Sequence, residues 1–98
     1  MAKGYVLCDI TVRDATGYED YKRLSEAAIA QYGGRYLVRG GEVDPLEGEP
    51  PSGRVVVLEF DTPAAARQWY DSPEYTAARR IRERTATGSL ALVTGVEA

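Results

Sequence analysis

The stretch "YGGRYLVRGG", residues 32–41, sets a short apolar and basic run between two glycine pairs. Alternation over such a run, bounded by glycine, predicts a β-strand, here residues 34–41. Because successive side chains of a strand point to opposite faces of the sheet, Arg35, Leu37 and Arg39 should share one face. That face would mix charge with apolar surface.

The segment "RVVVLEFD", residues 54–61, is rich in β-branched residues and predicts the next strand. Between the two strands lies a polar loop, "EVDPLEGEPPSG", with three prolines and two glycines, which is typical of a long hairpin tip. We therefore expect an antiparallel hairpin that pairs 35 with 59, 37 with 57 and 39 with 55.

Two further strands flank this hairpin in the sequence. Residues 5–12, "YVLCDITV", alternate cleanly between apolar and mixed positions, and residues 89–96, "SLALVTGV", read as the last strand.

Two of the segments between the predicted strands have the spacing of apolar residues that is typical of helices. Apolar residues recur at helical intervals over 18–32, and Gly33 supplies a left-handed stop. The second helical region is broken, because Ser72 followed by Pro73 is a helix-start signature. We expect helices over 63–70 and 73–85.

The predicted order is strand, helix, strand, strand, broken helix, strand. This is the βαββαβ arrangement of ferredoxin-like folds, an α+β class with a four-stranded antiparallel sheet and the helices on one face. A chain of 98 residues has room for one such domain, residues 1–98.

In this arrangement the two faces of the sheet differ in character. The face expected to bed the helices carries Val6, Cys8, Ile10, Tyr36, Val38, Val56, Leu58 and Phe60. The outer face carries an apolar patch larger than a monomer normally exposes, made of Tyr5, Leu7, Leu37, Val55 and Val57. We expect a second copy of the chain to cover it, giving a homodimer that pairs sheet to sheet.

The arginines of the outer face allow two interpretations. Arg35 and Arg39 would pair with Glu59, Asp61 or Asp9 in an ion network, because an unpaired charge in an interface is costly. Alternatively, Arg39 with Asp9 and Glu59 nearby would form a ligand site.

Composition excludes several classes of function. A net charge of −3 with scattered basic residues argues against nucleic acid as a partner, and the four arginines at 79, 80, 82 and 84 are expected on a solvated helix face. No apolar run is long enough for a membrane span, and no secretion signal is visible, so a cytoplasmic location is expected.

Chemistry that needs histidine is also excluded. The chain contains no histidine, so it lacks the commonest metal ligand and the usual haem ligand. Haem held by tyrosine or cysteine is disfavoured. No metal or cofactor is expected. The single cysteine, Cys8, reads as a small buried hydrophobe.

The segments "GYVLCDITVRD", "GYEDYKRL", "YGGRYLVRGG", "LEG", "RVVVLEF" and "WYDSPEYTAAR" together resemble the family of domain of unknown function 1330 over nearly the whole chain. That family is similar to the dimeric α/β-barrel superfamily, which includes cofactor-independent monooxygenases, muconolactone isomerases and haem enzymes. The resemblance implies a sheet-to-sheet dimer and a site between the helices and sheet of one subunit. It transfers no catalytic residue.

Two hypotheses of function follow. In the first, a cleft lined by Tyr18, Tyr21, Trp69, Tyr70 and Tyr75 binds or transforms a small apolar or aromatic molecule, with Arg39 or Asp9 as polar anchor. The same aromatic residues at helical spacing are also typical of a core. A carboxylate such as Asp9 or Glu59 could act as a base only if its pKa were raised, which a neighbouring arginine would oppose.

In the second hypothesis the chain is a non-enzymatic dimeric accessory or regulatory module. Its acidic loop tip, with Glu42, Asp44, Glu47 and Glu49, would be either a docking surface or a solvated loop.

Overall fold

The computed structural model describes residues 1–97 and contains four strands and three helices. The elements are β1 (Gly4–Val12), α1 (Ala15–Gln31), β2 (Arg35–Arg39), β3 (Arg54–Phe60), α2 (Pro63–Asp71), α3 (Pro73–Thr85) and β4 (Ala86–Thr94). The predicted order and the ferredoxin-like class are confirmed.

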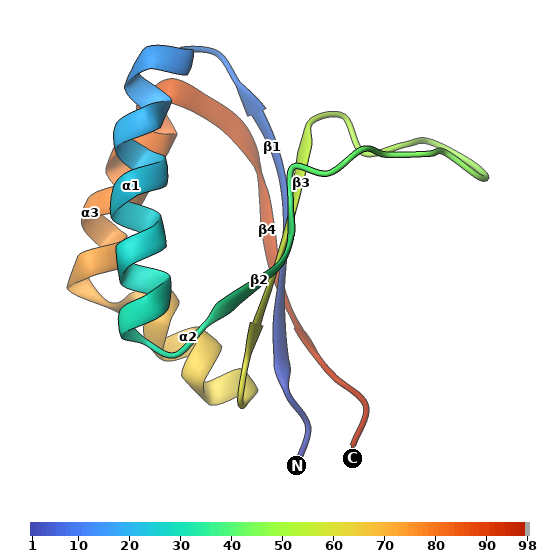
Figure 1. The fold of residues 1–98 in the computed structure, drawn as a ribbon, viewed down its shortest axis with the longest axis vertical. Helices are drawn as coiled ribbons and strands as arrows, with labels where there is room; N and C mark the ends of the chain where they lie inside the picture. Colours follow the sequence, from blue (N-terminus) through green and yellow to red (C-terminus); the bar gives the residue numbers. More distant parts are fainter. Residues whose placement is uncertain (98) are drawn as a thin grey trace.

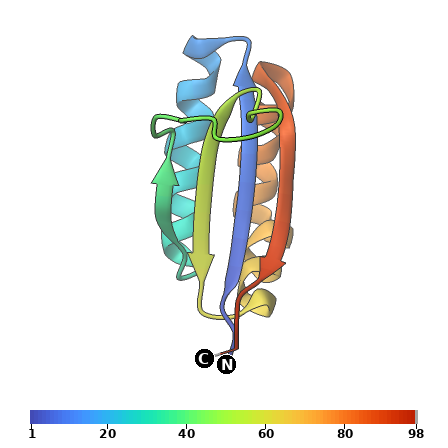
Figure 2. The ribbon, with the colours of Figure 1, turned by 90° about the vertical axis from the view of Figure 1, so that its right-hand side faces the viewer.

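The strands form one antiparallel sheet in the order β2-β3-β1-β4. All three helices lie on one face of this sheet (Figure 1). Within the described residues the other face carries no helix, and the loop between β2 and β3 crosses it near one end (Figure 2). This loop projects away from the helices, so the two faces have different surroundings.

Local capping chemistry explains where the helices begin. Asp14 caps α1 by accepting a hydrogen bond from the Gly17 backbone N–H at 3.1 Å, so this helix starts earlier than the predicted residue 18. The predicted break between α2 and α3 is confirmed. The Ser72 hydroxyl accepts from the Tyr75 backbone N–H at 3.1 Å, and Pro73 occupies the first helical turn.

The core lies between the helices and one face of the sheet. Its largest side chains are Trp69, Tyr75, Phe60 and Leu58, each at most 2% exposed. Cys8 is buried among them, as predicted. Burial of these side chains supplies the main apolar contribution to folding.

One prediction about the arginines of α3 is wrong. Arg80 and Arg84 are exposed, but Arg82 is only 9% exposed, and its Nε has no hydrogen-bond partner in the described part of the chain. Arg79 donates to the Tyr70 hydroxyl at 2.8 Å. Arg79 and Arg82 of α3 therefore lie toward the aromatic core, where the methylene groups of their side chains pack as apolar surface.

No helix within residues 1–97 is both long and apolar enough to cross a membrane.

Gly34→Ala is expected to destabilise the fold, because a Cβ at this position would lie 2.5 Å from a ring carbon of Phe60. Overpacking of this kind costs about 1–3 kcal/mol. Gly33→Asn is the matched control, since a Cβ there meets nothing within 4 Å and asparagine tolerates a positive φ. Urea unfolding followed by circular dichroism should give a lower midpoint for Gly34→Ala; equal midpoints would contradict the crowding argument.

Candidate functional site

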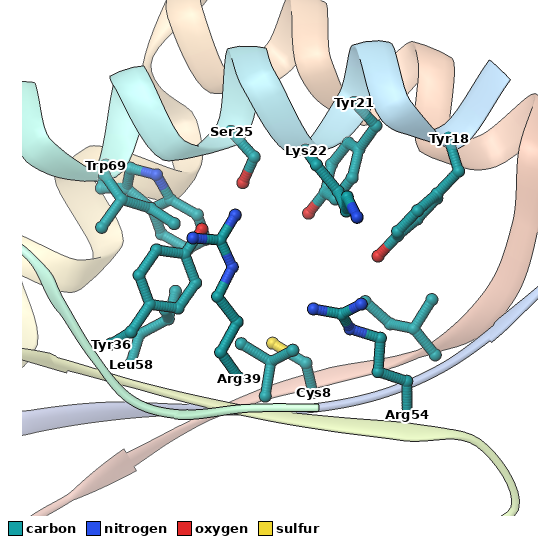
Figure 3. Close-up of a pocket in the computed structure, with 13 residues that line it drawn as sticks. Cys8, Tyr18, Tyr21, Lys22, Ser25, Tyr36, Arg39, Arg54, Leu58 and Trp69 are labelled. Carbon is teal, nitrogen blue, oxygen red and sulfur yellow. The ribbon is translucent and has the colours of Figure 1, made fainter. Parts of the chain in front are cut away.

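A cleft lies between α1 and the helix-covered face of the sheet (Figure 3). It opens beside the edge strand β2 and ends at Trp69 of α2. Its lining residues are Cys8, Ile10, Tyr18, Tyr21, Lys22, Ser25, Ile29, Tyr36, Arg39, Arg54, Val56, Leu58 and Trp69.

Regular periodicities place most of these side chains. The wall contributed by α1 repeats at helical intervals from Tyr18 through Lys22 and Ser25 to Ile29, so one stripe of the helix faces the sheet. The floor comes from alternate residues of the strands, among them Cys8 and Val56, which pair directly across β1 and β3.

Arg39 reaches the cleft because β2 contains a bulge. Arg35 pairs with Glu59 as predicted, but Leu37 is an extra residue, so that Val38 pairs with Val57 and Arg39 with Val56. The predicted pairings of 37 with 57 and 39 with 55 are therefore wrong. An extra residue reverses the faces of all residues beyond it.

Because of the bulge, the predicted environments of Val38 and Arg39 are also wrong. Val38, expected under the helices, is 38% exposed and shares the outer face with its partner Val57. Arg39, expected among outer-face acids, donates to Glu26 of α1 at 3.2 Å, and its guanidinium lies 4.3 Å from the ring centre of Tyr36.

Asp9 and Glu59 lie on the opposite face of the sheet from Arg39. Asp9 accepts hydrogen bonds from the backbone N–H groups of Ser52 and Gly53, at 3.1 and 2.8 Å, and so holds the end of the long loop. The expected combination of Arg39 with Asp9 and Glu59 is not brought together.

Glu59 belongs to an ion network on the outer face. It accepts from Arg35 at 2.6 Å and from the Tyr5 hydroxyl at 2.9 Å, while Arg35 also donates to Asp61 at 3.2 Å. The hydrogen bonds from Arg35 and then Tyr5 lower the pKa of Glu59. A carboxylate with a lowered pKa is a poor general base at neutral pH, so Glu59 does not support the hypothesis of a catalytic base. The predicted pairing of Arg35 with acidic residues is confirmed.

The predicted aromatic residues form one cluster, but they do not all line the cleft. Tyr18, Tyr21 and Trp69 line it, whereas Tyr75 lies behind them with no exposed surface. The hydroxyls of Tyr21 and Tyr75 are 2.9 Å apart, and the ring centres of Trp69 and Tyr75 are 4.2 Å apart. Tyr75 therefore supports the wall of the cleft from within the core.

The phenols of the cleft are neutral at physiological pH. Burial raises the pKa of Tyr18 to about 12, and burial, reinforced by Tyr75, also raises the pKa of Tyr21. Burial likewise raises the pKa of Tyr36. These tyrosines can donate hydrogen bonds but do not supply a base.

Three cations reach the cleft from three different elements: Lys22 from α1, Arg39 from β2 and Arg54 from β3. Sequence reasoning missed Lys22 and Arg54. The signal for Arg54 was available, because it shares the strand parity of Val56 and Leu58, which were placed under the helices. The signal for Lys22 was its helical offset of four residues from Tyr18.

The cleft is narrow in this state. The space between its side chains is about 390 Å³ when the open mouth is included, but only about 30 Å³ can hold the centre of a water molecule. That suffices for about one ordered water. A ring-sized ligand must therefore displace the long side chains at the mouth, of which Arg39 is 36% exposed.

The family model described as "Domain of unknown function (DUF1330)" matches residues 3–96. No curated protein matches the chain.

Solved structures share the fold at low sequence identity. A protein of unknown function from Rhodopseudomonas palustris superposes with a TM-score of 0.76 at 19% identity, covering 99% of this chain and 85% of that one. SnoaB, a cofactor-independent oxygenase from Streptomyces nogalater, gives 0.65 at 16% identity, with 100% and 97% covered. A dimeric protein of unknown function with a ferredoxin-like fold from Bacteroides fragilis gives 0.56 at 22%, with 94% and 93% covered.

Cys8 is expected to be unreactive although it lines the cleft, because burial raises the pKa of its thiol to about 12. At pH 8 its thiolate population should be roughly a thousandfold below that of an unfolded cysteine. Iodoacetamide labelling followed by mass spectrometry should be very slow in buffer and rapid in urea. Native labelling within tenfold of the urea rate would contradict this assignment.

Proposed function

The chain belongs to the family described as a domain of unknown function (DUF1330), so its role must be argued from its cleft, and we propose that this cleft binds a small, flat, apolar or aromatic molecule. The observation that carries the proposal is the aromatic wall of Tyr18, Tyr21 and Trp69 above an apolar floor, with polar groups only at a few points. Such a lining is typical of small-molecule sites.

Trp69 gives the proposal a specific polar feature. Its indole Nε1 is buried and has no hydrogen-bond partner among residues 1–97. An unsatisfied buried donor costs free energy, and a ligand acceptor that reaches this Nε1 would remove that cost.

The cleft supports binding more directly than catalysis. Within residues 1–97 no carboxylate lines it, and its phenols and thiol have raised pKa values. Oxygenation or isomerisation without a cofactor would therefore require a ligand that ionises readily by itself. SnoaB, which is similar in fold, is a cofactor-independent oxygenase, but the residues that line this cleft do not by themselves support such chemistry.

We propose further that the working form is a homodimer closed through the outer face of the sheet. Leu7, Leu37 and Val93 are exposed there by 44%, 51% and 43%, beside the partly buried Val57. A groove of about 460 Å³ lies between this face and Pro50 of the loop. A two-fold interface needs only one such self-complementary surface, and a relative with this fold is dimeric.

Occupation of the cleft can be tested with 2-naphthamide, a neutral aromatic probe, titrated into ¹⁵N-labelled protein. We expect chemical-shift changes to concentrate on the residues that line the cleft, and Ser25→Phe to abolish them, because Ser25 is 4% exposed and faces the cleft from α1. Ser25→Ala is the matched control and should bind as the wild type does. Shifts that scatter over the surface, or that persist in a folded Ser25→Phe variant, would refute the proposed site.

The dimer is tested by Leu7→Lys, which places a charge at the centre of the outer face. Because Leu7 is already 44% exposed in the isolated chain, the subunit should remain folded while the dimer dissociates. Leu24→Lys, on α1 and 38% exposed, is the control and should remain dimeric. Light scattering after size exclusion reports the mass; a wild-type monomer, or a dimeric Leu7→Lys variant, would argue against this interface.

A further inference from the structure

The cations of the cleft are concentrated in a chain whose net charge is −3. Lys22, Arg39 and Arg54 converge on one space from α1, β2 and β3, and no acidic side chain within residues 1–97 lines it (Figure 3). Such a site attracts anions even though the protein as a whole is acidic.

Two of these cations have only exposed partners. Lys22 meets Glu19 at 3.0 Å, and the Glu19 side chain is 65% exposed. Arg39 meets Glu26 at 3.2 Å, and the Glu26 side chain is 59% exposed. Pairs of this kind contribute little and are easily exchanged for another acceptor.

Arg54 differs because its side chain has no acceptor among the residues that the structure describes. Within residues 1–97 its guanidinium makes neither a hydrogen bond nor a salt bridge, and its Nε is buried without a partner. Buried polar groups in folded proteins are nearly always satisfied, and an acceptor that enters the cleft would satisfy the buried Nε of Arg54.

The local backbone makes room for Arg54. Gly40 adopts a φ of +69°, and a Cβ there would lie 3.1 Å from the Arg54 Cζ and Nε. The absence of a side chain at Gly40 therefore lets the guanidinium lie against the backbone and point into the cleft toward Tyr18, as Figure 3 shows.

From these observations we infer that the ligand of the cleft is a small aromatic or apolar carboxylate, whose anionic group is held by Arg54 and Arg39 and whose body lies along the tyrosines. This inference rests on the proposed function and specifies its ligand class. A planar carboxylate matches the fork of a guanidinium, and hydrogen bonds between charged groups are about twice as strong as neutral ones. The neutral hydroxyl of Tyr18, toward which Arg54 points, would add a donor.

The experiment compares 2-naphthoate with 2-naphthamide, two probes of the same shape that differ in charge, by NMR titration of the wild type, Arg54→Met and Arg23→Met. Arg23 is the matched control, because it lies on α1 but outside the cleft, with its side chain 72% exposed. We expect the wild type to prefer naphthoate by at least about tenfold, the lower end for a hydrogen bond to a charged group. Arg54→Met should lose most of that preference and keep its affinity for the amide, whereas Arg23→Met should keep both.

The results distinguish a cleft that binds no small molecule from one that binds without preferring a carboxylate. Equal affinity of the wild type for both probes, with shifts at the cleft, would overturn the carboxylate inference and leave the proposed function standing. An Arg54→Met variant that keeps the full preference would overturn the role of Arg54. Shifts from neither probe would overturn the proposed function, and the inference with it.

Discussion

The extra residue at Leu37 is the constraint on which the site and the outer surface both depend. Up to Tyr36 the strand β2 follows the regular register with β3, and beyond Leu37 every side chain is reversed. Arg39 is thereby moved from an outer surface that already holds its own ion network to the mouth of the cleft. Val38 is moved the other way. One inserted residue thus supplies a cation to one face and apolar area to the other.

This exchange is consistent with the length of the strand. β2 is the edge of the sheet and contains only five residues, so it has few ladder hydrogen bonds to lose when its register shifts. Bulges are common at sheet edges and beside functional sites, where they redirect side chains. The same edge position lets Arg39, which lines the cleft, remain 36% exposed.

The sequence predicted the fold because periodicity and capping are local signals. The break at Ser72 and Pro73 and the helix-facing set that includes Cys8 could be read directly from neighbouring residues. The candidate site was predicted less well. The bulge at Leu37 has no local signature, since the residues around it alternate as a regular strand would, and the shift emerges only from pairing with β3. Arg39 was consequently placed with Asp9 and Glu59, on the wrong face.

The chemistry of the cleft depends on which side chains lie on each face of the sheet. The carboxylates Asp9 and Glu59 lie on the outer face and are occupied, one by the backbone of the loop and the other by Arg35 and Tyr5. The cleft retains guanidinium, indole and phenol groups, all of which donate hydrogen bonds at neutral pH. Since no carboxylate among residues 1–97 lines it, the cleft is complementary to a molecule that supplies acceptors. Because burial raises the pKa of these phenols, they remain protonated hydrogen-bond donors across the physiological pH range.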